Sequence, residues 1–261
     1  MWPAWLKRTV PVAGSAPPQR PSRVPDGLRV YAIGDIHGRF DLLQQMQALI
    51  LGDAANAESR CEIVYLGDYV DRGPASREVI DLLASGPPPG FSATCLLGNH
   101  EAAMLQFLRD SSMGDAWLTY GGMPTLNSYG IPVVGPGSNA ASHQLQLRQL
   151  QAALNRNLPD AHRDFLTGLR ISHSIGDYFF AHAGVRPGVP LAAQEREDLI
   201  WIRDEFLLSR RDHGQVVVHG HSITQAVEEM PNRIGIDTGA YFSNRLSCLV
   251  LEGESRRFLS T

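Results

Sequence analysis

The chain has 261 residues, of which 43% are hydrophobic and 19% charged, and this balance is ordinary for a globular protein. The net charge of −4 gives no basic excess, so we expect no stable complex with a nucleic acid, although an RNA-derived substrate stays compatible with it. Three cysteines without CxxC spacing argue against a disulfide framework or a cysteine zinc site, and they fit a reducing compartment.

The N-terminal segment, residues 1–27, is predicted to be a flexible leader. Residues 11–27 read PVAGSAPPQRPSRVPDG, a composition rich in proline and small polar residues. The apolar start of the chain is brief and broken by Pro3, and no run approaches the roughly 18 apolar residues of a spanning helix. We therefore expect a cytoplasmic protein with no membrane span, in which one folded domain occupies residues 28–261.

Between residues 28 and 110 the sequence alternates three times between strand and helix patterns. The apolar segments LRVYAIG (28–34), CEIVYLGD (61–68) and FSATCLLG (91–98) are typical of buried strands. Each precedes a segment with the apolar spacing of a helix, at 39–52, 76–86 and 101–110. This alternation predicts an α/β fold with a mainly parallel sheet, in which ligands gather beyond the carboxyl ends of the strands.

Residues 111–160 interrupt this rhythm and are predicted to form a cap or loop region, with polar helices continuing to about Leu169. The aromatic and apolar residues Trp117, Tyr120 and Met123 either line a substrate groove there or, as we expect, pack in the core. Short strand patterns follow at 170–175, 177–183, 215–221, 226–230, 233–239 and 245–253. They predict a second sheet packed on the first.

Five predicted strand ends carry polar side chains next to glycine: GDIHG (34–38), GDYVDRGP (67–74), GNHE (98–101), FFAHAG (179–184) and VVVHGHS (216–222). Each motif alone has a plain structural explanation, such as an aspartate that caps a turn or a histidine that packs at a strand end. Together they supply carboxylate, amide and imidazole groups without a thiolate, a set that suits Mn, Fe or Zn. So many ligand positions exceed the needs of one ion, and we predict two ions bridged by a shared carboxylate.

In this order the motifs resemble those of the phosphoprotein phosphatase (PPP) family of calcineurin-like metallophosphoesterases, and in particular its bacterial and phage serine/threonine phosphatase branch. The resemblance covers roughly residues 28–252. It implies an α/β fold of two packed mixed β-sheets flanked by helices, with two divalent metal ions at the sheet ends. We expect these ions to be Mn²⁺, with Fe or Zn as alternatives.

The resemblance assigns six side chains to the metal ions. Those that match ligands are Asp35, His37 and Asp68 for the first metal, with Asp68 as the bridge, and Asn99, His182 and His221 for the second.

The resemblance also assigns residues to the phosphate and to the leaving group. His100 matches a general acid that, in its imidazolium form, protonates the leaving alkoxide, and Asp71 matches the residue that orients this histidine. Arg72, and Arg203 in LIWIRDEF, match arginines that bind phosphate, and Asn99 is assigned to the phosphate as well as to the metal.

The chain departs from the family pattern at two places. The family's RGNHE reads LGNHE here, with Leu97 in place of the arginine, so any phosphate or packing role of that arginine is lost. The eukaryotic SAPNYC segment is replaced by IDTGAYFSNRL, which puts eukaryotic partner and toxin recognition in doubt but not the chemistry. Of the nearby acidic residues, Glu101 is expected to stabilise a helix start, and Asp237 either orients a ligand histidine or caps a turn.

The predicted activity is hydrolysis of phosphate monoesters, foremost those of phosphoserine and phosphothreonine in proteins or peptides, with small phosphate esters as substrates in vitro. The attacking group is predicted to be a metal-bridging hydroxide, without a phosphoenzyme. The alternative substrate is a dinucleoside tetraphosphate or another nucleotide or RNA end, because hydrolases of these compounds share the early motifs. A non-catalytic binding domain is disfavoured, because every expected ligand and the acid are present.

Overall fold

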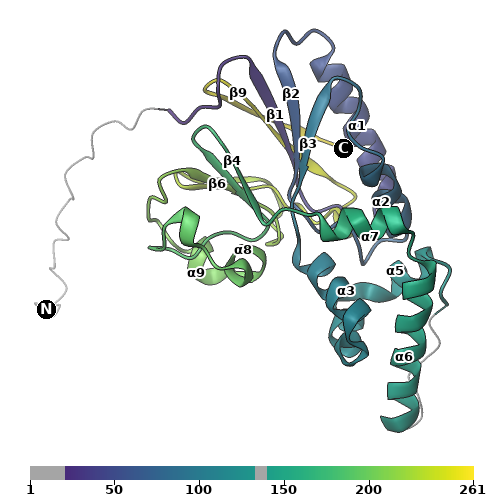
Figure 1. Ribbon diagram of the computed structural model, residues 1–261. Helices are drawn as coiled ribbons and strands as arrows, with labels where there is room; N and C mark the ends of the chain where they lie inside the picture. The colour runs from purple at the N-terminus through teal and green to yellow at the C-terminus, as the bar shows by residue number, and fades with distance from the viewer. Residues whose placement is uncertain (1–20, 133–139) are drawn as a thin grey trace, which may run out of the picture.

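A computed structural model describes residues 21–132 and 140–261 of the chain. Two five-stranded mixed sheets pack face to face, and helices cover their outer faces (Figure 1). The strand order is β10-β9-β1-β2-β3 in the first sheet and β4-β5-β6-β8-β7 in the second. The predicted α/β fold of two packed mixed sheets flanked by helices is confirmed. No helix in the described ranges is long and apolar enough to cross a bilayer.

The first sheet is built on the three strands expected from the N-terminal half. Strands β1 (Leu28–Ile33), β2 (Arg60–Tyr65) and β3 (Phe91–Cys95) run parallel to one another. The helices that follow them are α1 (Phe40–Ala54), α2 (Ser76–Ala84) and α3 (Asn99–Arg109). In Figure 1, α1 and α2 lie along the outer face of this sheet.

The C-terminal strands return to the first sheet. Strand β9 (Ser247–Glu252) pairs antiparallel with β1, and β10 (Ser255–Ser260) forms the edge beside it. The prediction that residues 245–253 join the second sheet is therefore wrong. The side chains of β9 are buried on both faces of the sheet, as a place beside the central strand β1 requires.

The second sheet consists of short strands, some paired parallel and others antiparallel. Its members are β4 (Ser172–Ile175), β5 (Tyr178–Ala181), β6 (Val216–His219), β7 (Glu228–Glu229) and β8 (Arg233–Gly235). Strands β5, β6 and β8 are parallel, while β4 and β7 pair antiparallel at the two edges. A 3₁₀ turn (Leu191–Ala193), α8 (Arg196–Trp201) and α9 (Asp204–Leu207) follow β5, and α10 (Ala240–Ser243) precedes β9.

The predicted cap region is largely helical where the structure describes it. A 3₁₀ turn (Ser111–Met113), α4 (Gly114–Trp117), a π-helical turn (Leu118–Gly122) and α5 (Met123–Ser128) are followed by α6 (Ala140–Asn157) and α7 (Asp160–Thr167). Residues 133–139 lie outside the described ranges. Core packing is confirmed for Trp117, which is fully buried, but it is wrong for Tyr120 and Met123, which are 41% and 46% exposed.

Successive side chains along each strand point to opposite faces of its sheet, and this alternation produces separate core layers. Tyr31 and Ile33 of β1 pack with α1 and α2, whereas Val30 and Ala32 face the second sheet. In β5, Phe180 belongs to the layer between the sheets, and its neighbours pack on α8 and α9. Because successive side chains of a strand point to opposite faces, the strands are held from both sides, and the loops at their carboxyl ends have rigid supports.

Part of the predicted leader is packed against the domain. Val24 is fully buried in the layer between the sheets, and its N–H donates to the Gly253 carbonyl at 3.0 Å. The hydroxyl of Tyr178 donates to the Ser22 carbonyl at 3.2 Å. The packed part of the chain thus begins before Leu28, the boundary expected from composition. The rest of the leader, residues 1–20, lies outside the described residues.

This packing leads to a prediction for Val24→Asp. We expect the substitution to lower the free energy of unfolding by roughly 3 kcal/mol or more, because an unpaired charge would be buried. Thermal and urea unfolding measure the effect. Leu208→Asp, at a side chain that is 79% exposed, is the matched control and should change stability little. Equal stabilities of the two variants would instead indicate that residues 22–27 are the flexible segment that their composition suggests.

Candidate active site

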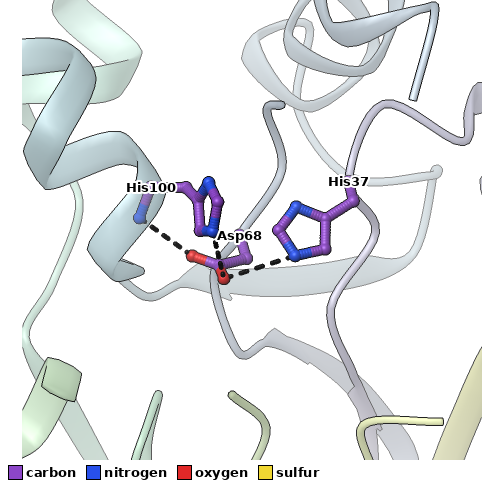
Figure 2. Close-up of side chains that lie close together, drawn as sticks. All are labelled: His37, Asp68 and His100. Atoms are coloured by element: carbon purple, nitrogen blue, oxygen red, sulfur yellow. Dashed lines mark hydrogen bonds and ion pairs between the residues drawn. The ribbon is translucent and has the colours of Figure 1, made fainter. Parts of the chain in front are cut away.

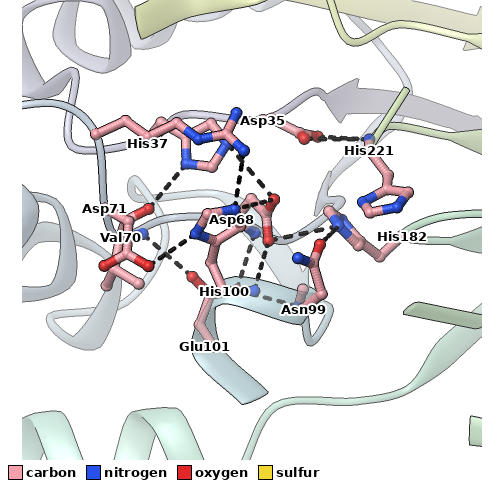
Figure 3. A network of polar contacts seen from close by, with 12 residues as sticks. Asp35, His37, Asp68, Val70, Asp71, Asn99, His100, Glu101, His182 and His221 are labelled. Carbon is pink, nitrogen blue, oxygen red and sulfur yellow. Dashed lines mark hydrogen bonds and ion pairs between the residues drawn. The ribbon is translucent and has the colours of Figure 1, made fainter. Parts of the chain in front are cut away.

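The five polar motifs converge where loops leave the carboxyl ends of β1, β2, β3, β5 and β6 (Figure 3). This follows from parallel pairing, which brings these strand ends to one edge of the two sheets. All of the side chains predicted as metal ligands or as the acid are at most 5% exposed: Asp35, His37, Asp68, Asn99, His100, His182 and His221. The two sheets therefore assemble one buried polar cluster from segments far apart in the sequence.

Asp68 lies at the centre of this cluster. Its Oδ2 is 3.5 Å from Nε2 of His37 and 3.8 Å from Nε2 of His100 (Figure 2). Its Oδ1 is 3.4 Å from Nε2 of His182. Two sets of potential ligand atoms, each within 4.8 Å of one another, share this carboxylate: His37, Asp68 and His100 in one, and Asp68, His182 and His221 in the other. The arrangement offers two adjoining cation positions with one carboxylate between them.

Backbone carbonyls orient two of the imidazoles. Nδ1 of His37 donates to the Val70 carbonyl at 2.9 Å, and Nδ1 of His182 donates to the Leu66 carbonyl at 2.9 Å. Because Nδ1 of each ring is bound to a carbonyl, Nε2 is the nitrogen that faces Asp68, the orientation expected of metal-binding histidines. Nε2 of His182 also lies 2.9 Å from Oδ1 of Asn99, so the predicted ligands of the second position are neighbours.

Asp35 is held in the cluster by the backbone of the loop that follows β6. Both of its carboxylate oxygens accept from the backbone N–H of His221, at 3.2 and 3.1 Å. Burial, the charge of Asp237 and the charge of Asp68 raise the pKa of Asp35 well above its ordinary value. Asp237 caps a turn, since its Oδ1 accepts from Gly239 N–H at 2.9 Å, and its side chain also forms a hydrogen bond with Asp35. Three buried carboxyl groups in one place favour a cation among them.

The donor set also fits a cation at His221. Its Nε2 is buried and has no hydrogen-bond partner among the described residues. Burial first, and then the neighbouring His182, lower the pKa of His221 to about 2, so the imidazole is neutral. A buried polar atom without a partner is costly in an apolar setting, and a neutral imidazole nitrogen is a good metal ligand. Imidazole, carboxylate and amide groups around Asp68 therefore suit divalent cations.

His100 and Asp71 form a dyad beside the first cation position. Nδ1 of His100 donates to Oδ2 of Asp71 at 2.7 Å, while its Nε2 lies 3.2 Å from Nη2 of Arg72. Burial alone would lower the pKa of His100, but the charge of Asp68 and the hydrogen bond to Asp71 raise it above the ordinary value. Distances alone group His100 with His37 and Asp68, so its role as an acid rests on the resemblance and not on the geometry.

The two predicted phosphate-binding arginines lie beside different histidines. Arg72 is next to His100, and its guanidinium carbon lies 4.7 Å from the ring centre of Tyr241. Nη1 of Arg203 donates to the His221 carbonyl at 3.3 Å. Tyr241 is a contact that no motif indicated, because it belongs to the segment that departs from the family pattern.

Backbone strain gathers at the site. Of the six non-glycine residues with positive φ in the described ranges, five belong to it: His37 (48°), Asp68 (52°), Asp71 (72°), Arg72 (68°) and His221 (62°). Left-handed conformations of such residues cost of order 1–3 kcal/mol each and persist only where the surroundings enforce them. The glycines of the motifs suggest tight turns, but nothing in the sequence indicates which neighbouring side chains share the strained conformation.

Glu101 has a larger role than the expected helix start. Its Oε1 accepts from the N–H groups of Tyr69 at 2.7 Å and Val70 at 3.1 Å. Its Oε2 accepts from those of Asp68 at 2.9 Å and Gly98 at 3.0 Å. Burial and the charge of Asp68 raise the pKa of this fully buried carboxyl to about 7. The side chain fastens the loop after β2 to the start of α3, and so holds two motifs together.

Glu101→Ala is expected to lower the free energy of unfolding by roughly 3 kcal/mol or more, because several buried N–H groups lose their acceptor at once. Urea unfolding gives the value. Glu101→Gln, which retains one acceptor oxygen, should lie between the alanine variant and the unchanged protein. The exposed Glu58→Ala serves as the control. Stability equal to that of this control would show that the loop does not depend on Glu101.

Comparisons with known proteins agree with this geometry. The family model of calcineurin-like phosphoesterases matches residues 28–243. Serine/threonine-protein phosphatase 2 of Escherichia coli (strain K12) is 27% identical over 226 residues, which cover 84% of this chain and 90% of that protein. A symmetrical bis(5'-nucleosyl)-tetraphosphatase of Paracidovorax citrulli (strain AAC00-1) is 40% identical over 78 residues, or 30% of this chain and 25% of that protein.

A solved structure described as a putative diadenosine tetraphosphatase has the same fold. It superposes with a TM-score of 0.58 at 22% sequence identity and covers 89% of this chain and 93% of its own. The family match is broader evidence, since it spans most of the chain and includes all five polar motifs. The chain therefore belongs to the calcineurin-like phosphoesterase family.

Proposed function

We propose that this metallophosphoesterase is a serine/threonine protein phosphatase that hydrolyses phosphate monoesters of proteins or peptides. The observation that carries the proposal is the buried Asp68, shared by two sets of potential metal ligands, beside a histidine–aspartate dyad and an arginine. The bacterial relative that aligns with 84% of the chain bears the name of this activity. The chemistry of the site and the length of that alignment support the same substrate class.

The predicted ligands would hold two divalent cations as assigned from the sequence: Asp35, His37 and Asp68 at the first position, and Asp68, Asn99, His182 and His221 at the second. When bound, two such ions neutralise charge on the phosphoryl group and lower the pKa of water from 15.7 to about 7. We propose Mn²⁺ as these ions, since oxygen and imidazole donors without thiolate suit it. The three free cysteines support the proposed cytoplasmic location, where thiols stay reduced.

The remaining groups bind the phosphoryl group or deliver a proton to the leaving group. Arg72 and Arg203 bind oxygens of the phosphoryl group, where a guanidinium can make paired charge-assisted hydrogen bonds, and Asn99 donates to another from its amide. His100 transfers the proton on Nε2 to the alkoxide oxygen of the departing serine or threonine. Asp71 accepts the hydrogen bond from Nδ1 of His100 and fixes the direction in which Nε2 points.

A panel of substrates tests the proposal. The purified chain, loaded with Mn²⁺, is assayed with a phosphoserine peptide, a phosphotyrosine peptide, p-nitrophenyl phosphate and diadenosine tetraphosphate. We expect the highest kcat/KM for the phosphoserine peptide and loss of activity with a chelator. Preference for diadenosine tetraphosphate by orders of magnitude would establish the alternative, a dinucleoside tetraphosphate hydrolase. Absence of metal-dependent hydrolysis of every substrate would favour a non-catalytic binding domain.

A further inference from the structure

Two side chains of the short helices after α3 contact the carboxylate of Asp71. The indole Nε1 of Trp117 donates to its Oδ2 at 3.0 Å and is 3.2 Å from its Oδ1. The hydroxyl of Thr125 donates to Oδ1 at 2.7 Å. All three side chains are fully buried. Together with Nδ1 of His100, these donors surround both oxygens, so the carboxylate is held from three separate helices.

The same segment also forms hydrogen bonds with the backbone of the turn that carries Asp71 and Arg72. The N–H of Asp71 donates to the Thr125 hydroxyl at 2.8 Å and to that of Ser76 at 3.1 Å. The N–H of Arg72 donates to the Gly121 carbonyl at 3.0 Å. Two consecutive left-handed residues are unfavourable without such support, because each strains the backbone. Residues 117–125 therefore enforce the conformation of this turn.

The contacts of Trp117 go beyond what core packing needs. The ring packs on Phe107 with centroids 5.0 Å apart, an apolar contact that a phenylalanine would also make. A Cβ at Gly122 would lie 2.7 Å from Cε2 of Trp117, so the absence of a side chain at Gly122 leaves room for the indole ring. The indole N–H is the part that reaches Asp71. A buried N–H needs an acceptor, and here the acceptor is the partner of the predicted acid.

We propose that Trp117 and Thr125 are positioning residues for proton transfer to the leaving group. By fixing the carboxylate of Asp71 they fix the ring of His100, whose Nε2 must face the departing oxygen. The torsion that turns a carboxylate is soft, so loss of either donor lets Asp71 rotate and misdirects the histidine. This inference rests on the proposed function, because it assigns the predicted acid dyad its supports. Loss of an outer hydrogen-bond partner of a metal-binding histidine costs about 10- to 100-fold in metal affinity or activity, and we expect a loss of the same order for the partners of Asp71.

The test compares leaving groups in the variants Trp117→Phe and Thr125→Val. A phosphoserine peptide releases a strongly basic alkoxide and depends on the acid, whereas p-nitrophenyl phosphate releases a weakly basic phenolate and depends on it little. We expect kcat for the peptide to fall about 10- to 100-fold in each variant, with a much smaller loss on p-nitrophenyl phosphate and unchanged metal content. Thr125→Ser retains the hydroxyl and should restore the activity on the peptide.

Two controls separate positioning from general damage. Phe107→Leu alters the packing of Trp117 without removing a hydrogen bond to Asp71, and it should reduce activity on both substrates by the same factor, if at all. In a His100→Asn background, Trp117→Phe should cause no further loss on the peptide. Equal losses on both substrates in Trp117→Phe and Thr125→Val, with an active unchanged protein, would overturn this inference alone. An unchanged protein that hydrolyses neither substrate would overturn the proposed function and the inference with it.

Discussion

Asp68→Asn is expected to reduce phosphatase activity by at least about a thousandfold and to lower the metal content as well. Asp68 is the carboxylate shared by both sets of potential metal ligands, and an amide retains its shape but loses its charge. A bound divalent ion contributes several kcal/mol to stabilisation of transition-state charge, and about 4 kcal/mol corresponds to a thousandfold in rate. The bound metal should also fall below the content of the unchanged protein, because the predicted bridge belongs to both positions.

Two measurements check this prediction. Elemental analysis after dialysis gives the metal content, and hydrolysis of p-nitrophenyl phosphate over a range of Mn²⁺ concentrations gives activity. The matched control is Asp164→Asn, the same change at an exposed position of α7, which should alter neither quantity. A variant at Asp68 that retains full metal content and near-normal activity would rule out a bridging role for this carboxylate.

His100→Asn is expected to lower kcat about 10²- to 10⁴-fold, the range that general acids supply, while the metal content stays that of the unchanged protein. The loss should be greater for a phosphoserine peptide than for p-nitrophenyl phosphate, because only the former has a strongly basic leaving group. Fluorescence and circular dichroism would establish that the variant is folded.

Metal content decides between two roles for His100. The distances place it as near to His37 and Asp68 as a ligand would be, whereas its short hydrogen bond to Asp71 suits an oriented acid. Loss of metal in His100→Asn would make it a ligand and leave the reaction without an identified acid. His173→Asn is the control, since His173 bonds to Glu62 away from the site and its replacement should leave kcat unchanged.

Much of the site could be predicted from the sequence because its residues lie at the ends of strands. An aspartate and a histidine two positions apart after an apolar segment, as in Asp35 and His37, leave one strand in a known direction. Parallel pairing then brings such ends together, and the order of the motifs matches a family whose site is shared by its members. Roles such as ligand or acid remain predictions, because several neighbouring groups around Asp68 lie at similar distances.

Other features were hidden because they depend on contacts between segments without a regular pattern. Trp117 and Thr125 reach Asp71 across 46 and 54 positions of sequence, from helices of only a few residues. The ring of Tyr241, in α10, stacks with Arg72 from a segment that departs from the family pattern. Val24 comes from a proline-rich segment whose composition resembles a leader, yet it fills a space that exists only between the assembled sheets.

The sequence by itself determined the α/β class, the strand and helix segments before residue 110, and the side chains that form the polar cluster, because each of these follows from periodicity or from short motifs. Tertiary structure alone decided that β9 lies beside β1, that Glu101 joins two motifs, and that the strained turn at Asp71 and Arg72 is held by the helices after α3. The physical reason is that a strand or a loop selects its partner by the burial and hydrogen bonds available when all segments are packed, and these are absent from any local stretch of the chain.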